Sequence, residues 1–328
     1  MPHETDIATL DSIACLVRED DPVIDSIWLP GDGHLQMEDH QLGAVCSTLA
    51  GYLRDGFRGR RHDEFPMHIC AWGKAHAGSP APYDLFGLAG VPSYYQPVKS
   101  ALRTLFAGEA PAPWNLPAAE RQPCIVSKET QGPYSLGECL FISLRVLIEA
   151  GYPPDRLHLI IVEHDPASVL ASWLSRLAAL QTQERLLHHC IIAALNVNRV
   201  RRYARRHGVP VTHYVHEAGK EPLGAARALF RRLGISRRVE PLQAAGFERP
   251  GLYGSDSADG GRVGATTVAD EHRRMLEEAG VYRTYRQAVA ACIRDLDLDV
   301  WSSGKSRGET GSVVRLSARA GSCGIIGG

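Results

Sequence analysis

A loop of small residues, 73–80, separates an apolar run at 67–72 from a stretch of helical character at 83–86. In a strand–loop–helix unit, loop amides and the helix N-terminus converge on one point and hold a phosphate or a sulfate. An ordinary strand–helix turn has a similar composition, so this loop alone leaves both interpretations open. The side chains that we expect near the anion are Lys74, His76, Gly78 and Ser79.

A second group of reactive residues follows two other apolar runs. Lys128 and Glu129 come after the run 124–126, and His164 comes after the run 157–162. Transfer of a phosphoryl or sulfuryl group needs a cation near the bridging oxygen and a base for the acceptor hydroxyl. We assign these roles to Lys128 and Glu129. His164, like His76, could contact a sulfate and act as a general acid when protonated.

The elements that must position these residues follow from hydrophobic periodicity. Helical patterns separate the apolar runs, and this alternation predicts a parallel sheet covered on both faces, a three-layer α/β/α fold. We expect an N-terminal extension (1–64), a main α/β domain (65–300) and a flexible tail rich in Gly and Ser (301–328). The predicted strands are 67–70, 124–126, 157–162 and 209–214. The predicted helices are 42–53, 136–150, 165–177, 184–207, 222–233, 268–279 and 282–296.

Composition limits the class of protein. The 328 residues are 44% hydrophobic and carry a net charge of −1, so global charge favours neither nucleic acid nor an anionic membrane as a partner. The eight cysteines show no C-x-x-C pair. Together with an acidic N-terminus and no apolar run of about 20 residues, they lead us to expect a cytoplasmic protein with reduced thiols.

From residue 66 to about 235 the chain resembles the PAPS-dependent sulfotransferases. The segment 76–80 resembles the family's loop for the 5′-phosphosulfate of the donor, and 91–97 (VPSYYQP) its extended segment beside the acceptor. His164-Asp165-Pro166, with Ser172 eight positions after the histidine, is similar to the Arg-Asp-Pro and serine signature that binds the 3′-phosphate. Segments at 200–204, 209–211 and 225–234 match the family's closing helix, strand and helix.

This resemblance implies a P-loop-like sulfotransferase fold with PAPS as cofactor. It implies donor contacts from Lys74, His76, Gly78, Ser79, His164 and Ser172, and from Arg307 and Gly308 in the tail. The expected substrate wall consists of Tyr94, Tyr95, Tyr134 and Trp173. Histidines at 76 and 164 replace the family's basic residues, and Pro80 removes a loop amide. A neutral imidazole offers one donor where a guanidinium offers a charged fork, which weakens donor binding.

Three hypotheses therefore remain open. The first is a bacterial-type sulfotransferase that moves a sulfuryl group from PAPS to a hydroxyl or amine of a small metabolite in natural-product biosynthesis. The second is a relative that binds the sulfate ester of its substrate and eliminates sulfate with ring closure, as in aziridine or azabicycle formation. The third is a non-catalytic subunit. We expect a small-molecule substrate, free or on a carrier protein, and a partner subunit or a homodimer, with no metal.

Overall fold

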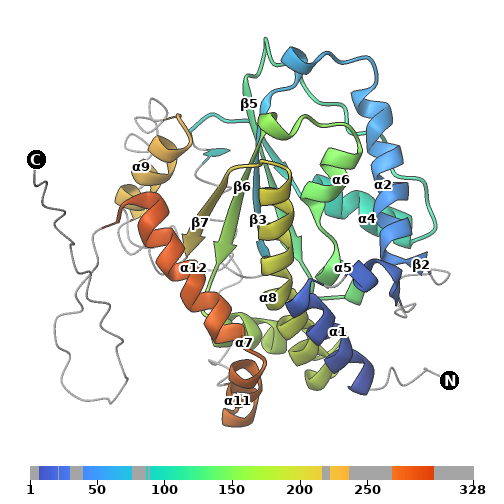
Figure 1. Cartoon of the computed structure of the whole chain (residues 1–328), viewed down its shortest axis with the longest axis vertical. Coiled ribbons are helices and arrows are strands. Elements are labelled where there is room, and N and C mark those ends of the chain that lie inside the picture. Colours follow the sequence, from blue (N-terminus) through green and yellow to red (C-terminus); the bar gives the residue numbers. More distant parts are fainter. Residues whose placement is uncertain are drawn as a thin grey trace, which may run out of the picture. The chain divides into compact units, whose positions relative to one another are not determined.

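The computed structural model describes residues 7–20, 22–29, 40–75, 86–87, 89–215, 222–235 and 268–298. Its centre is a parallel sheet of five strands in the order β4-β5-β3-β6-β7 (Figure 1). The strands are β3 (Met67–Lys74), β4 (Ser93–Tyr95), β5 (Cys124–Gln131), β6 (Leu157–Glu163) and β7 (Val211–Val215). Helices pack on both faces, so the predicted three-layer α/β/α fold is confirmed.

Two apolar clusters, one on each face of the sheet, hold the layers together. Alternate residues of the strands point to opposite faces. Cys70, Ile125 and Leu159 belong to the larger cluster, whereas Ile69, Val126 and Ile160 belong to the smaller one. The helices that contribute to the larger cluster include α2 (Leu42–Phe57), α4 (Pro97–Phe106), α7 (Pro166–Leu177) and α8 (Gln183–Arg206). The smaller cluster contains side chains of α9 (Pro222–Arg232) and α12 (Val281–Leu296).

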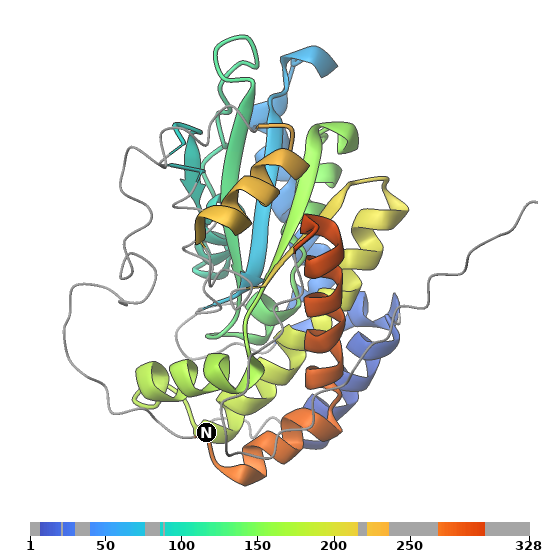
Figure 2. The same ribbon diagram turned by 90° about the vertical axis from the view of Figure 1, so that its left-hand side faces the viewer.

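The order of the strands places β3 at the centre of the sheet. The chain leaves β3 toward β4 and β5 on one side and later reaches β6 and β7 on the other side, as two perpendicular views show (Figures 1 and 2). Open α/β sheets bind ligands at the switch point, where the connections that follow two neighbouring parallel strands run to opposite sides of the sheet. In this sheet it lies between the carboxyl ends of β3 and β6.

Most predicted elements are confirmed with small changes at their ends, but the predicted helix 136–150 is two helices. α5 (Leu136–Leu140) ends before Phe141 and Ile142, which are extended, and α6 (Ser143–Glu149) follows. The side-chain amide of Asn196 in α8 donates to the carbonyl oxygens of Cys139 and Leu140, each at 3.1 Å. These carbonyls therefore keep partners where the helix is interrupted.

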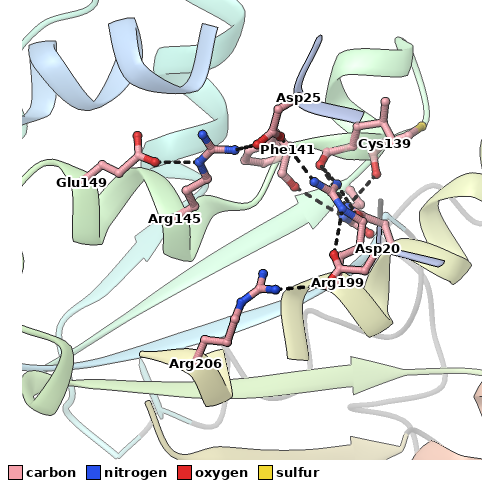
Figure 3. Close-up of polar contacts among 11 residues, drawn as sticks. Asp20, Asp25, Cys139, Phe141, Arg145, Glu149, Arg199 and Arg206 are labelled. Atoms are coloured by element: carbon pink, nitrogen blue, oxygen red, sulfur yellow. Dashed lines mark hydrogen bonds and ion pairs between the residues drawn. The ribbon is translucent and has the colours of Figure 1, made fainter. Parts of the chain in front are cut away.

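The N-terminal extension packs against the α/β core. The buried residues Ile13 and Val17 of α1 (Ile7–Glu19) belong to the larger cluster. Asp25 and Asp20 connect the extension to arginines of α6 and α8 (Figure 3). The nearest ion pairs join Asp25 to Arg145 at 2.8 Å and Asp20 to Arg202 at 3.0 Å. The described residues up to Leu298 accordingly form one unit.

Helix α12 covers the outer edge of β7. Asp295 accepts hydrogen bonds from the backbone and the Nδ1 of His213, at 3.0 and 2.9 Å, and the Cys292 sulfur accepts from the amide of Val215 at 3.4 Å. An edge strand with free amides can pair with other chains, and these contacts prevent that at this edge. α11 (Asp270–Glu278) precedes α12, so both predicted C-terminal helices are present.

Candidate functional site

Three polar side chains form a row across the carboxyl ends of β5, β3 and β6. Gln131 is the register partner of Lys74, and Glu163 follows Val162, the partner of Gly73. All three side chains point to the face of the larger cluster, because they alternate with Thr130, Gly73 and Val162. Lys74 and Glu163 form an ion pair that is almost fully buried. We call Gln131, Lys74 and Glu163 the polar row.

Gly73 allows the two central strands to approach closely beside the polar row. A Cβ at this position would lie 2.4 Å from the carbonyl oxygen of Val162, a contact that side chains do not tolerate. The glycine is therefore required for strand packing, whatever the following loop binds.

The chain is held tightly where it leaves β3. The amide of Ala75 donates to the carbonyl oxygen of Gln131 at 2.9 Å, and the carbonyl of Ala75 accepts from the indole Nε1 of Trp173 at 2.7 Å. The indole lies against Gly132, where a Cβ would be 2.7 Å from Cη2. Trp173 thus clamps the loops after β3 and β5 together. It is fully buried, so it presents no exposed surface in this structure.

Several residues of the predicted anion site lie outside the described part of the chain. They are His76, Gly78 and Ser79 of the loop after β3, and Arg307 and Gly308 of the tail. Of the loop residues expected near the anion, the structure therefore places Lys74 alone, and its ammonium already contacts Glu163.

Lys128 and Glu129 point to opposite faces of the sheet, because they are neighbours in β5. The Nζ of Lys128 lies 5.0 Å from the ring centroid of Tyr95, a cation–π contact on the side of the smaller cluster. Glu129 is buried on the other side, where its oxygens accept from the amides of Val98 and Lys99 at 2.9 and 3.1 Å. The two side chains are therefore not arranged as a cation and a base around one substrate atom.

The contacts of Glu129 are those of a helix cap. Carboxylates are stabilised by the free amides and the dipole of a helix N-terminus, here that of α4. Burial nevertheless raises the pKa of Glu129 to about 7, against the opposing effect of the amides of Val98 and Lys99. Both protonation states are therefore accessible near neutral pH, although the side chain is engaged within the protein.

His164 and Ser172 flank the first two turns of α7. Asp165 begins this helix, because its Oδ1 accepts from the amide of Ser168 at 2.9 Å. His164 is the residue before this cap and Ser172 lies in the middle of the helix, and both are half-buried. This order of strand, histidine, capping aspartate and helix agrees with the arrangement that the sequence predicts.

The expected aromatic substrate wall is not a single surface. Tyr94 packs against Trp114 with ring centroids 5.4 Å apart, on the side of the larger cluster. Tyr95, its neighbour in β4, is 62% exposed and lies beside Lys128. Tyr134 lies beyond the end of β5, with the guanidinium of Arg103 5.1 Å from its ring centroid. These tyrosines occupy three separate environments.

The sequence analysis assigned no role to a further buried lysine near the end of β5. Lys99 of α4 pairs with Glu138 of α5 at 3.0 Å, and Glu138 also pairs with Arg103 at 2.6 Å. The Nζ of Lys99 donates in addition to the Thr130 hydroxyl and the Gly132 carbonyl. The scarcity of lysine, with five in the chain, was the one signal that could have drawn attention to Lys99.

No known protein family and no curated protein matches this chain at the level of sequence. Among the described residues, His, Cys, Asp and Glu form no group of three or more that could hold a metal ion. No helix in the described ranges has both the length and the apolar character required to cross a membrane.

Proposed function

We propose that this chain is a sulfotransferase-type enzyme that transfers a sulfuryl group from PAPS to a hydroxyl or amine of a small metabolite. The observation that carries the proposal is the point where the chain leaves β3, at Lys74 and Ala75. This point lies at the carboxyl edge of the central strand, beside β6, where the sheet changes direction. Loops at this position in α/β sheets bind phosphate-bearing ligands.

The contacts of Ala75 support this proposal. A phosphate-binding loop must present its amides in a fixed arrangement, because preorganised donors avoid an ordering cost on binding. The hydrogen bonds from Ala75 to Gln131 and from Trp173 to Ala75 fix both polar backbone groups at the start of the loop. His164, at the carboxyl end of the neighbouring strand β6, would contact the same ligand.

One observation favours the second candidate, an enzyme that eliminates sulfate from a sulfate ester with ring closure. The ammonium of Lys74 is neutralised by Glu163, so this pair adds no net charge for a donor that carries both a phosphosulfate and a 3′-phosphate. A sulfate monoester carries a single negative charge and therefore needs less positive charge in its binding site. The same site would then stabilise the departing sulfate.

Calorimetric titration of the full-length protein with PAP, the product nucleotide, tests the proposal. We expect micromolar affinity, a loss of about 10- to 100-fold in His76→Ala from one hydrogen bond to a charged group, and no change in the exposed control His207→Ala. Absence of PAP binding by the wild type would reject PAPS as the donor. Binding of inorganic sulfate that depends on His76 would then select the second candidate.

A further inference from the structure

The polar row lies at the carboxyl end of the sheet, on the face of the larger cluster. Gln131, Lys74 and Glu163 are 0%, 1% and 2% exposed. Neighbouring strands are about 4.8 Å apart, so the three side chains lie side by side under the cover of the larger cluster. Two residues before Lys74, on the same face of β3, the fully buried Trp72 lies next to this row.

Several polar atoms of this region have no partner. The Oε1 of Glu163, the Oε1 of Gln131 and the Nε1 of Trp72 are buried without a hydrogen bond. Among the described residues, Glu163 is the one acceptor for the three N–H donors of Lys74. The amide nitrogen of Gln131 is directed at the carbonyl of Phe141, 3.5 Å away, so its oxygen points elsewhere. Buried polar groups are almost always paired, and this concentration of unpaired atoms indicates a missing ligand.

The chemistry of these atoms selects the ligand. The two free oxygens require a donor, and the N–H groups of Lys74 that meet no acceptor among the described residues require one. A sulfate has no donor and would place bare oxygens against the carboxylate, while an amine would carry positive charge toward Lys74. A hydroxyl group donates its hydrogen to one of these oxygens and accepts from Lys74, and it is neutral, as is the Lys74–Glu163 pair taken together.

We propose that the polar row binds one hydroxyl group, which is water in the resting protein and the acceptor hydroxyl of the substrate during transfer. The role of the row in binding the acceptor hydroxyl depends on the proposed sulfotransferase function. In that step the hydroxyl proton moves to Glu163 and the hydroxyl oxygen forms a bond to sulfur. The bond from sulfur to the 5′-phosphate oxygen of PAPS breaks, and PAP leaves with the electron pair. Glu163 is then the catalytic base, a role that the sequence assigned to Glu129.

A comparison of two buried polar atoms tests whether the row is occupied. The Oγ of Ser143 in α6 is also buried without a partner, but no polar row surrounds it. Ser143→Ala should leave Tm within about 1 °C or raise it, since it removes an unpaired group. Gln131→Leu should lower Tm by about 2–6 °C, because it removes a partner of the bound hydroxyl. An unchanged or higher Tm for Gln131→Leu would overturn the proposal.

Crystals of the full-length protein, untreated and soaked in ethylene glycol, distinguish the two sources of the hydroxyl. We expect a water within hydrogen-bond distance of both Oε1 atoms in the untreated crystal and a glycol hydroxyl in its place after soaking. A water that remains after soaking would support the water site and overturn the substrate role. A polar row that holds neither water nor glycol would overturn both the water site and the substrate role. None of these outcomes depends on PAP binding, so failure of this inference and failure of the proposed function are separable.

Discussion

Two buried lysines near the carboxyl edge of the sheet have different surroundings. Lys99 has an acceptor for each of its three donors, namely Glu138, Thr130 and Gly132. Lys74 is equally buried, yet Glu163 is its one acceptor in the described part of the chain. Lys99 lies to one side of the sheet beside α4, whereas Lys74 lies where the central strands change direction.

The difference separates a structural group from a candidate functional one. Burial lowers the pKa of Lys99, and Glu138 opposes this effect. A buried ammonium whose three donors are all engaged has no capacity for a further acceptor. A buried ammonium with spare donors, next to unpaired acceptors, does have that capacity. The following predictions test this distinction.

Removal of Glu138 should have the largest effect. Glu138→Ala leaves Lys99 as an uncompensated buried charge, and we expect a loss of about 3–5 kcal/mol in the free energy of unfolding. Urea denaturation measures it. Asp55→Ala, which removes the partner of Arg58 in an exposed pair, should change stability by less than about 1 kcal/mol. Equal effects of the two variants would contradict a structural role for the Lys99 network.

Replacing both partners of each pair tests the comparison directly. Lys99→Met with Glu138→Leu should cost about 2–4 kcal/mol, because Thr130, the Gly132 carbonyl and Arg103 all lose partners. Lys74→Met with Glu163→Leu should cost about 1 kcal/mol, since apolar replacement of a buried ion pair is often neutral and the hydroxyl bound to the row loses partners. The second double variant should nevertheless lose activity. Comparable losses of stability at the two sites would remove the distinction.

Glu129 should make the folded protein less stable as the pH rises. Its pKa is raised from 4.5 to about 7, so the folded protein holds this proton more tightly than the unfolded chain does. The associated stability is fully present below about pH 4.5 and is lost as the pH rises through about 7, by at most about 3 kcal/mol. Unfolding measured at pH 4.5 and pH 8 should show a steeper decline in the wild type than in Glu129→Gln.

Other groups contribute with the opposite sign, so the difference between the two proteins is the quantity to compare. Burial lowers the pKa of His158 and His189 to about 4, which favours folding as the pH rises from 4 toward 6.5. Both histidines are unchanged in Glu129→Gln, and their effect cancels. The same pH dependence in both proteins would show that Glu129 does not titrate in this range.

The sheet was predictable because buried parallel strands are continuous apolar runs, and each of the four predicted runs is a strand. β4 and α4 were not predicted as elements. β4 has three residues, and α4 begins after Gln96, whose left-handed backbone (φ 50°) has no sequence signature. α1 was also missed.

The candidate site was harder to predict, since its contacts join distant parts of the chain. Glu163 pairs with Lys74 across 89 positions, and Trp173 bonds to Ala75 across 98. The sequence placed Lys128 and Glu129 beside each other, but alternation along a strand separates neighbours onto opposite faces. That argument was available from sequence once the strand was extended to Gln131.

Trp173→Phe should give the most informative change in binding. The substitution removes the hydrogen bond to Ala75 and also the outer indole atoms that lie against Gly132, so we expect a loss of about 1–3 kcal/mol in the free energy of unfolding. If the start of the loop must be fixed for anion binding, affinity for PAP should fall by about 5- to 10-fold. Trp114→Phe is the matched control, because Trp114 packs against His68 and Tyr94, away from the loop. Calorimetry measures both affinities, and an equal affinity of the two variants would show that the clamp serves stability alone.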